Sequence, residues 1–105
     1  MISTVFAVFA DAAEADRIAA TVIEERLAAC ANILAPCRSI YRWQGKVERA
    51  EEVPALFKSA KADALIARIA ELHSYDMPAI VEWRVQDSHS VYASWVETET
   101  SGSGN

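Results

Sequence analysis

The chain switches repeatedly between two hydrophobic periods, and this alternation constrains its fold more than any other feature. Residues 2–10 are almost continuously apolar, β-branched or aromatic, which predicts a strand inside a sheet. From Asp11 to about Cys30, apolar residues recur every three or four positions, which predicts an amphipathic helix. Asp11 and Glu14 form an aspartate variant of the capping box at its start. A sheet packed against helices is therefore expected.

The middle of the chain reads as a long β-hairpin. Residues 33–43 and 47–60 have extended patterns, and Gln44, Gly45 and Lys46 join them. Gly45 can supply the positive φ that a tight turn needs. Pro54 lies inside the second arm and cannot donate a ladder hydrogen bond. It therefore predicts an edge, a bulge or a strand break.

The second half repeats the helix-then-strand pattern. Asp63 is a candidate cap for a helix with an apolar face, and Pro78 prevents its continuation. A strand over residues 79–85 and a short helix over residues 90–98 follow. The resulting β-α-β-β-α-β-α order predicts an α+β protein. The expected fold is a ferredoxin-like βαββαβ sandwich with an antiparallel four-stranded sheet, a long hairpin and an extra C-terminal helix. Residues 1–100 form one domain and residues 101–105 a flexible tail.

Composition excludes several classes of protein. The chain is 52% apolar and 24% charged, which excludes a disordered protein. No apolar run approaches the roughly 18 residues that a membrane-spanning helix needs, so no membrane partner is expected. The net charge of -5 opposes binding to nucleic acid. The N-terminus has neither a basic start nor a small-residue cleavage site, which indicates a cytoplasmic protein.

Apolar side chains in the extended segments are too many for one face of one sheet. A sheet with helices on one side leaves its other face uncovered, so self-association is expected to cover it. The aromatic residues Trp43, Trp83, Tyr92 and Trp95 are interpreted as core or interface residues. The aliphatic and aromatic residues behind this argument are Ile33, Leu34, Ile40, Leu56, Phe57 and Trp83.

Three residues are candidate metal ligands. His73 lies at the end of the second predicted helix, where an imidazole can either cap the helix or bind a metal ion, and spacing alone favours the cap. Cys30 and Cys37 are expected to be free thiols, because two cysteines seven residues apart form neither a disulfide framework nor a zinc motif. A buried hydrophobic role is favoured for Cys30, whereas Cys37 could bind copper. Any metal site must be assembled across the fold or between subunits.

A second group of polar residues accompanies the hairpin. Regular alternation places Glu48, Glu52 and Lys58 on one face of the second arm, near Tyr41 and Trp43. Two carboxylates and an amine could form a polar pocket. A salt-bridge network between subunits is the favoured interpretation.

Four short segments together resemble the CutA family of divalent-cation tolerance proteins. They are residues 27–32 (LAACAN), 41–46 (YRWQGK), 73–78 (HSYDMP) and 92–96 (YASWV). The resemblance implies a trimer, with the Y-x-W-x-G-K-x-E pattern at subunit contacts and a neighbouring cleft. It also implies weak copper(2+) binding at the histidine of H-x-Y-x-x-P, which is His73 here. An acidic residue commonly follows the proline of that motif in the family, and Ala79 stands there in this chain.

Three classes of function are compatible with these residues. The first is a homotrimeric divalent-cation tolerance protein that binds copper(2+) weakly. The second is a small-molecule sensor resembling the PII signalling trimers, with a metabolite in clefts between subunits. The third is an enzyme that uses Lys58 or His73 as acid or base; no second catalytic group is placed by sequence, so a non-enzymatic function is expected. The expected cleft residues are Tyr41, Lys58, Glu52, His73 and Tyr75.

Overall fold

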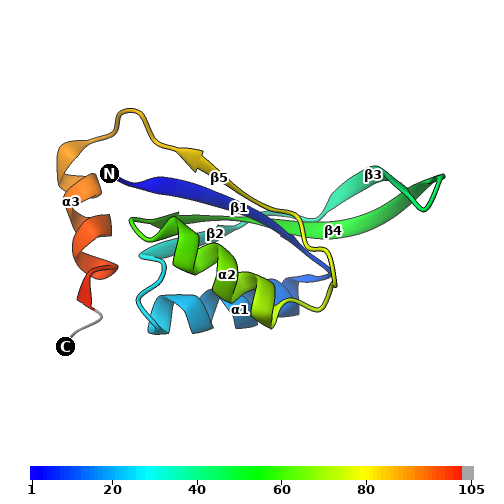
Figure 1. Ribbon diagram of the computed structural model, residues 1–105, viewed down its shortest axis with the longest axis horizontal. Coiled ribbons are helices and arrows are strands. Elements are labelled where there is room, and N and C mark those ends of the chain that lie inside the picture. Colours follow the sequence, from blue (N-terminus) through cyan, green and yellow to red (C-terminus); the bar gives the residue numbers. More distant parts are fainter. Residues whose placement is uncertain (103–105) are drawn as a thin grey trace.

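The computed structural model describes residues 1–102, which form one sheet covered on one face by two helices (Figure 1). Helices α1 and α2 lie side by side beneath the sheet, the β3-β4 hairpin projects from one end, and α3 lies at the other end. The elements are β1 (Ser3–Phe9), α1 (Ala12–Glu24), β2 (Cys30–Ile33), β3 (Cys37–Trp43), β4 (Lys46–Ser59), α2 (Ala62–Leu72), β5 (Ile80–Arg84) and α3 (Ser90–Glu99).

All strand pairs in the sheet are antiparallel. The order is β2-β4-β1-β5, and β3 pairs with the first half of β4. This arrangement confirms the ferredoxin-like α+β fold with its long hairpin and C-terminal helix. None of the described helices is long and apolar enough to cross a membrane.

The hydrophobic core lies between the sheet and helices α1 and α2. Alternate residues of β1 and β4 point into it, because successive side chains of a strand lie on opposite faces. Phe9 and Phe57 meet edge to face with ring centroids 6.3 Å apart. The helices contribute apolar residues at helical spacing. The core residues include Val5, Ala7, Phe9, Ala15, Ile18, Val22, Val53, Ala55, Phe57, Leu65 and Ile69.

Helix α1 ends six residues earlier than the sequence pattern predicts. It ends at Glu24, and Arg26 then adopts a left-handed conformation with φ 62°. The Leu27 amide donates to the Val22 carbonyl at 2.9 Å, and the Arg26 amide donates to the Ile23 carbonyl at 3.0 Å. These two bonds form a Schellman motif. Glycine usually occupies the left-handed position. Because arginine occupies it here, the sequence does not mark the end of the helix. Cys30 is consequently the first residue of β2.

The predicted first arm of the hairpin is two strands. Residues 34–36 separate β2 from β3, and Pro36 cannot donate a ladder bond. Strand β4 continues unbroken through Pro54, whose carbonyl accepts from the Leu34 amide at 2.9 Å. The amide and carbonyl of one strand residue point to the same side. The nitrogen of Pro54, which has no hydrogen to donate, therefore faces the gap between β2 and β3.

The hairpin turn follows the prediction, whereas the start of α2 does not. Gln44 and Gly45 have φ values of 51° and 82°, as a two-residue type I′ turn requires. Lys61, rather than Asp63, is the N-cap of α2, and no side chain caps it. Asp63 lies in the first turn, where its negative charge interacts favourably with the helix dipole.

Residues 103–105 of the predicted tail lie outside the described residues.

The face of the sheet opposite α1 and α2, called the open face below, is only partly covered by the chain. Trp83 stacks on Phe6 with centroids 5.4 Å apart, yet it remains 52% exposed. Trp43 and Trp95 are 45% and 43% exposed. These tryptophans are therefore not core residues of the single chain. Phe57, in contrast, was expected among the surplus apolar residues and is fully buried.

Candidate ligand-binding cleft

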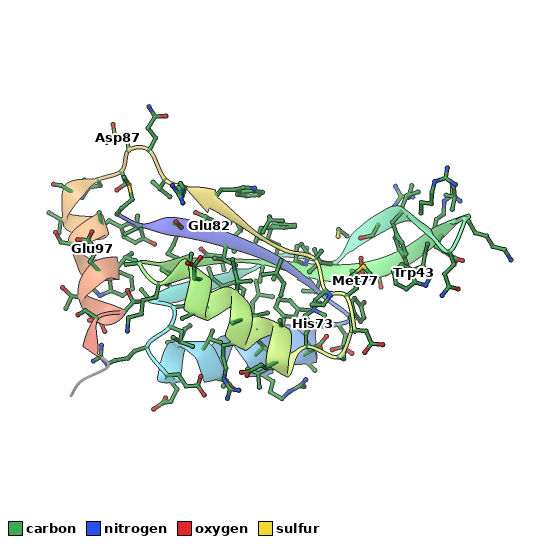
Figure 2. All side chains as sticks on the ribbon, viewed as in Figure 1. Trp43, His73, Met77, Glu82, Asp87 and Glu97 are labelled. Atoms are coloured by element: carbon green, nitrogen blue, oxygen red, sulfur yellow. The ribbon has the colours of Figure 1, made fainter. Side chains whose placement is uncertain are left out.

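A cleft of about 610 Å³ lies between the β3-β4 hairpin and the loop that joins α2 to β5. Figure 2 shows Trp43 on the hairpin and Met77 on that loop. Strands β3 and β4 supply one wall, the loop supplies the other, and Val8 of β1 contributes from the sheet. The lining residues are Val8, Ser39, Tyr41, Trp43, Glu52, Tyr75, Asp76, Met77 and Ala79.

A hydrogen bond joins the two walls of the cleft. The Tyr75 hydroxyl donates to Oε2 of Glu52 at 2.8 Å. Burial raises the pKa of Tyr75 to about 12, and the bond to the Glu52 carboxylate adds to that rise. The phenol therefore stays protonated at neutral pH and keeps the Glu52 carboxylate in place.

His73 lies buried beneath this loop, with both ring nitrogens engaged. Its Nδ1 accepts from the Tyr75 amide at 3.1 Å, and its Nε2 lies 2.7 Å from the Val8 carbonyl oxygen. Because an amide only donates and a carbonyl only accepts, the ring is the neutral tautomer with its hydrogen on Nε2. The ring also stacks on Phe9, with centroids 5.1 Å apart. In this arrangement His73 holds the loop, and a metal ion would have to displace one of the two bonds.

Glu14 ties the start of α1 to the same loop. One carboxylate oxygen accepts from the Ala10 amide at 2.9 Å, and the other accepts from the Ser74 amide at 2.7 Å. Burial alone would raise the pKa of Glu14, but the hydrogen bonds from Ala10 and Ser74 lower it. The Asp11 cap is confirmed, since its Oδ1 accepts from the Glu14 amide at 2.9 Å. The long-range contact to Ser74 had no sequence signal.

The two cysteines share the open face but lie far from each other. Cys30 is opposite Lys58, and Cys37 is opposite Glu52. Six residues of β4 separate these positions, or about 20 Å at ~3.3 Å per residue. Both thiols are free, as predicted. Within residues 1–102, no group of three or more His, Cys, Asp or Glu side chains is placed to hold a metal ion.

Each thiol has one neighbouring hydroxyl. Sγ of Cys30 lies 3.3 Å from the Tyr92 hydroxyl of α3, and Sγ of Cys37 lies 3.8 Å from the Ser39 hydroxyl. Burial and the Cys30 contact raise the pKa of Tyr92 to about 12. Cys37 thus adjoins Ser39 and Glu52, which both line the cleft.

Four of the residues predicted for a cleft or for its polar surroundings lie together, and three lie elsewhere. Tyr41, Trp43, Glu52 and Tyr75 all line the cavity. Glu48 is opposite Tyr41 on the hairpin, and Lys58 is opposite Thr4 in the main sheet. His73 is buried beneath the loop, and none of these three residues lines the cleft. The sequence analysis did not assign Ser39, Asp76 and Met77 to the cleft. Asp76 and Met77 stand inside the H-x-Y-x-x-P motif, which was the available signal.

Comparison with known proteins identifies the family. A family model described as CutA1 divalent ion tolerance protein matches residues 3–99. The chain belongs to the CutA1 family. Divalent-cation tolerance protein CutA of Pyrococcus horikoshii is 41% identical over 98 residues, covering 91% of this chain and 95% of that relative. The CutA protein of Pectobacterium atrosepticum is 39% identical over 88 residues, covering 82% of this chain and 80% of that relative.

Solved CutA structures share the whole fold. CutA from Xylella fastidiosa superposes with a TM-score of 0.91 at 34% identity, covering 94% of this chain and 97% of that one. CutA1 from Thermus thermophilus gives 0.92 at 35% identity, covering 95% and 99%. CutA from Archaeoglobus fulgidus, 28% identical with a TM-score of 0.91 over 95% of this chain and 99% of that one, is named periplasmic. The cytoplasmic location inferred for this CutA1 chain therefore stays a prediction.

Proposed function

We propose that this protein acts in divalent-cation tolerance as a homotrimer that binds copper(2+) weakly. Membership of the CutA1 family and relatives named for divalent-cation tolerance support the general function. The observation that carries the ion-binding part is the position of Cys37. Its thiol lies on the open face, directly across the ladder from the Glu52 carboxylate.

The proposed donors suit a weak copper site. A thiolate and a carboxylate on neighbouring strands offer one soft and one hard ligand to a first-row metal ion. Two ligands from one chain leave further positions for water or for a neighbouring subunit. His73 positions the loop beside this site through its bonds to Val8 and Tyr75. The donors are not arranged as a closed structural metal site, which is consistent with weak, reversible binding.

The open face supports the proposed self-association. Two large apolar side chains of β5 on this face, Val81 and Trp83, are 45% and 52% exposed in the single chain. Neighbouring apolar residues on a sheet face mark an interaction surface, since water contact with them is unfavourable. A closed ring of identical chains would cover this face without leaving a free copy of it.

Calorimetric titration of freshly reduced protein with copper(2+) under nitrogen tests the ion-binding part. We expect Cys37→Ser to weaken binding at least about tenfold, a change of ~1.4 kcal/mol. Cys30→Ser is the matched control, because it removes the other open-face thiol about 20 Å away. Light scattering on the same samples should give the mass of three chains. Wild-type protein that takes up no copper, or equal losses in both variants, would remove Cys37 from the site.

The cleft favours a second candidate function, which is small-molecule sensing. Its volume of about 610 Å³ lies within the range of roughly 300–1,000 Å³ that is typical of ligand pockets. Three aromatic rings and a few polar groups line it, as is common in such pockets. A trimer would present three such clefts.

A further inference from the structure

We propose that the cleft binds a small organic cation, specifically a protonated amine attached to an apolar or aromatic group. This inference rests on the second candidate function, since it names the ligand class of that cleft. Three observations carry it: the charge of the lining, the kind of side chains that form its walls, and the size of the space.

The charge of the lining is one-sided. Glu52 and Asp76 contribute carboxylates, and no Lys, Arg or His is among the lining residues that the structure describes. The hairpin does carry arginines, but strand alternation places Arg38, Arg42 and Arg49 on its other face. Lys46 is opposite Trp43 on the cleft face of the hairpin, but it does not line the cleft. The lining therefore favours cations over anions.

The walls of the cleft offer aromatic faces for a cation. Tyr41 and Trp43 come from β3, and Tyr75 comes from the opposite loop. Tyr41 and Trp43 are 42% and 45% exposed in the single chain, where part of each ring faces the cleft. A cation over the face of Trp or Tyr is attracted by the negative face of the ring, and more strongly as the site loses water.

The remaining lining groups select an organic cation over a metal ion. Val8, Ala79 and the thioether of Met77 provide apolar surface. Ala79 adds no charge, so it leaves apolar surface beside Asp76. A bare divalent ion gains nothing from such surface, whereas a phenyl or alkyl group attached to an amine does.

Calorimetry with three probes of nearly equal shape tests this inference. The full-length protein is titrated at pH 7 in chelator-treated buffer with 2-phenylethylamine, which is protonated, with neutral 2-phenylethanol, and with anionic phenylacetate. We expect the amine to bind at least about tenfold more tightly than the alcohol, and phenylacetate not to bind. Removing metals keeps the result independent of the copper titration.

A matched pair of variants assigns the binding to the cleft. Glu52→Gln removes one charge and keeps an oxygen that can accept from Tyr75, so the walls stay joined. Glu48→Gln removes the same charge from the same face of β4, outside the cleft. We expect amine affinity to fall about five- to tenfold in the first, ~1–1.4 kcal/mol, and to stay within about twofold in the second.

Each other outcome overturns the inference in a different way. Equal affinity for amine and alcohol would leave the cleft as a ligand site but remove the cation preference. Preferred binding of phenylacetate would reverse the assigned charge. Equal losses in the two glutamine variants would place the cation on the hairpin surface outside the cleft. No binding of any probe at millimolar concentration would reject both the cation and the small-molecule candidate, leaving the copper proposal standing.

Discussion

The two faces of the sheet are built from the same strands but have opposite surroundings. On the face covered by α1 and α2, Val5 and Phe57 are fully buried. On the open face, Phe6 and Trp83 stack on each other, and Trp83 is still 52% exposed. Both faces are apolar, so composition does not separate them. The difference shows that one face stabilises the single chain, while the other is available for partners or ligands.

The largest difference in stability loss is expected between alanine substitutions of two phenylalanines on neighbouring strands. Phe57→Ala should reduce the free energy of unfolding by about 3–5 kcal/mol, because it leaves a cavity under the helices. Phe6→Ala, on the open face, should cost less in dilute protein, and its cost should grow with protein concentration as chains associate. Urea denaturation at several concentrations measures both. Equal, concentration-independent losses would contradict the division between the faces.

On the covered side, Glu14→Gln should reduce stability by about 1–3 kcal/mol at neutral pH. An amide group cannot accept from both the Ala10 and Ser74 amides, so one buried donor loses its partner. The pKa of Glu14 is lowered in the folded state, so its contribution is present above the unfolded pKa of about 4.3 and is lost as pH falls through the folded value. The difference between wild type and variant should therefore shrink below pH 4.

The control for this substitution is Glu24→Gln on the same helix, whose side chain is exposed. Thermal unfolding between pH 3 and pH 7 compares the three proteins. Wild type and Glu14→Gln curves that stay parallel down to pH 3 would show that the carboxylate charge is not involved.

On the open face, Trp83→Asp should change association more than folding. The chain loses the stacking on Phe6, worth about 0.5–1.5 kcal/mol, and keeps its covered core. A charge placed on the proposed contact surface should reduce the mass in light scattering from three chains to one. If the variant still has the mass of three chains, the contact surface does not include this part of β5.

The smallest effect is expected from Tyr75→Phe in the cleft. Loss of the bond to Glu52 should cost about 0.5–1 kcal/mol at neutral pH. Because the folded pKa of Tyr75 is raised to about 12, this contribution is present below the unfolded value of about 10 and is lost as pH rises through 12. Wild type and variant should therefore converge in stability above pH 12. Absorbance titration should also show one fewer phenol ionising near pH 12.

Features that depend on neighbouring residues were predictable, and features that depend on distant contacts were less so. The Asp11 cap and the Gly45 turn follow from local backbone chemistry. The end of α1 was missed because an arginine, Arg26, takes the left-handed position that glycine usually marks. The Asp63 cap was wrong because the N-cap of α2 is Lys61, two residues earlier.

The cleft was predictable only in part, for a physical reason. The sequence motifs named Tyr41, Trp43, Glu52 and Tyr75, which do line it. They also suggested His73, whose role depends on the Val8 carbonyl 65 residues away. No local pattern encodes that hydrogen bond, so the choice between a free imidazole and an engaged one came only from the folded chain.

The sequence by itself determined the order of strands and helices, because hydrophobic periods of 2 and 3.6 are local properties of the chain. Only the tertiary structure decided which face each thiol occupies. Three residues, 34–36, lie opposite two residues of β4, and this extra residue reverses the alternation between β2 and β3. Cys30 and Cys37, seven positions apart, therefore share the open face. Such a reversal depends on pairing with β4, which the sequence of the arm does not specify.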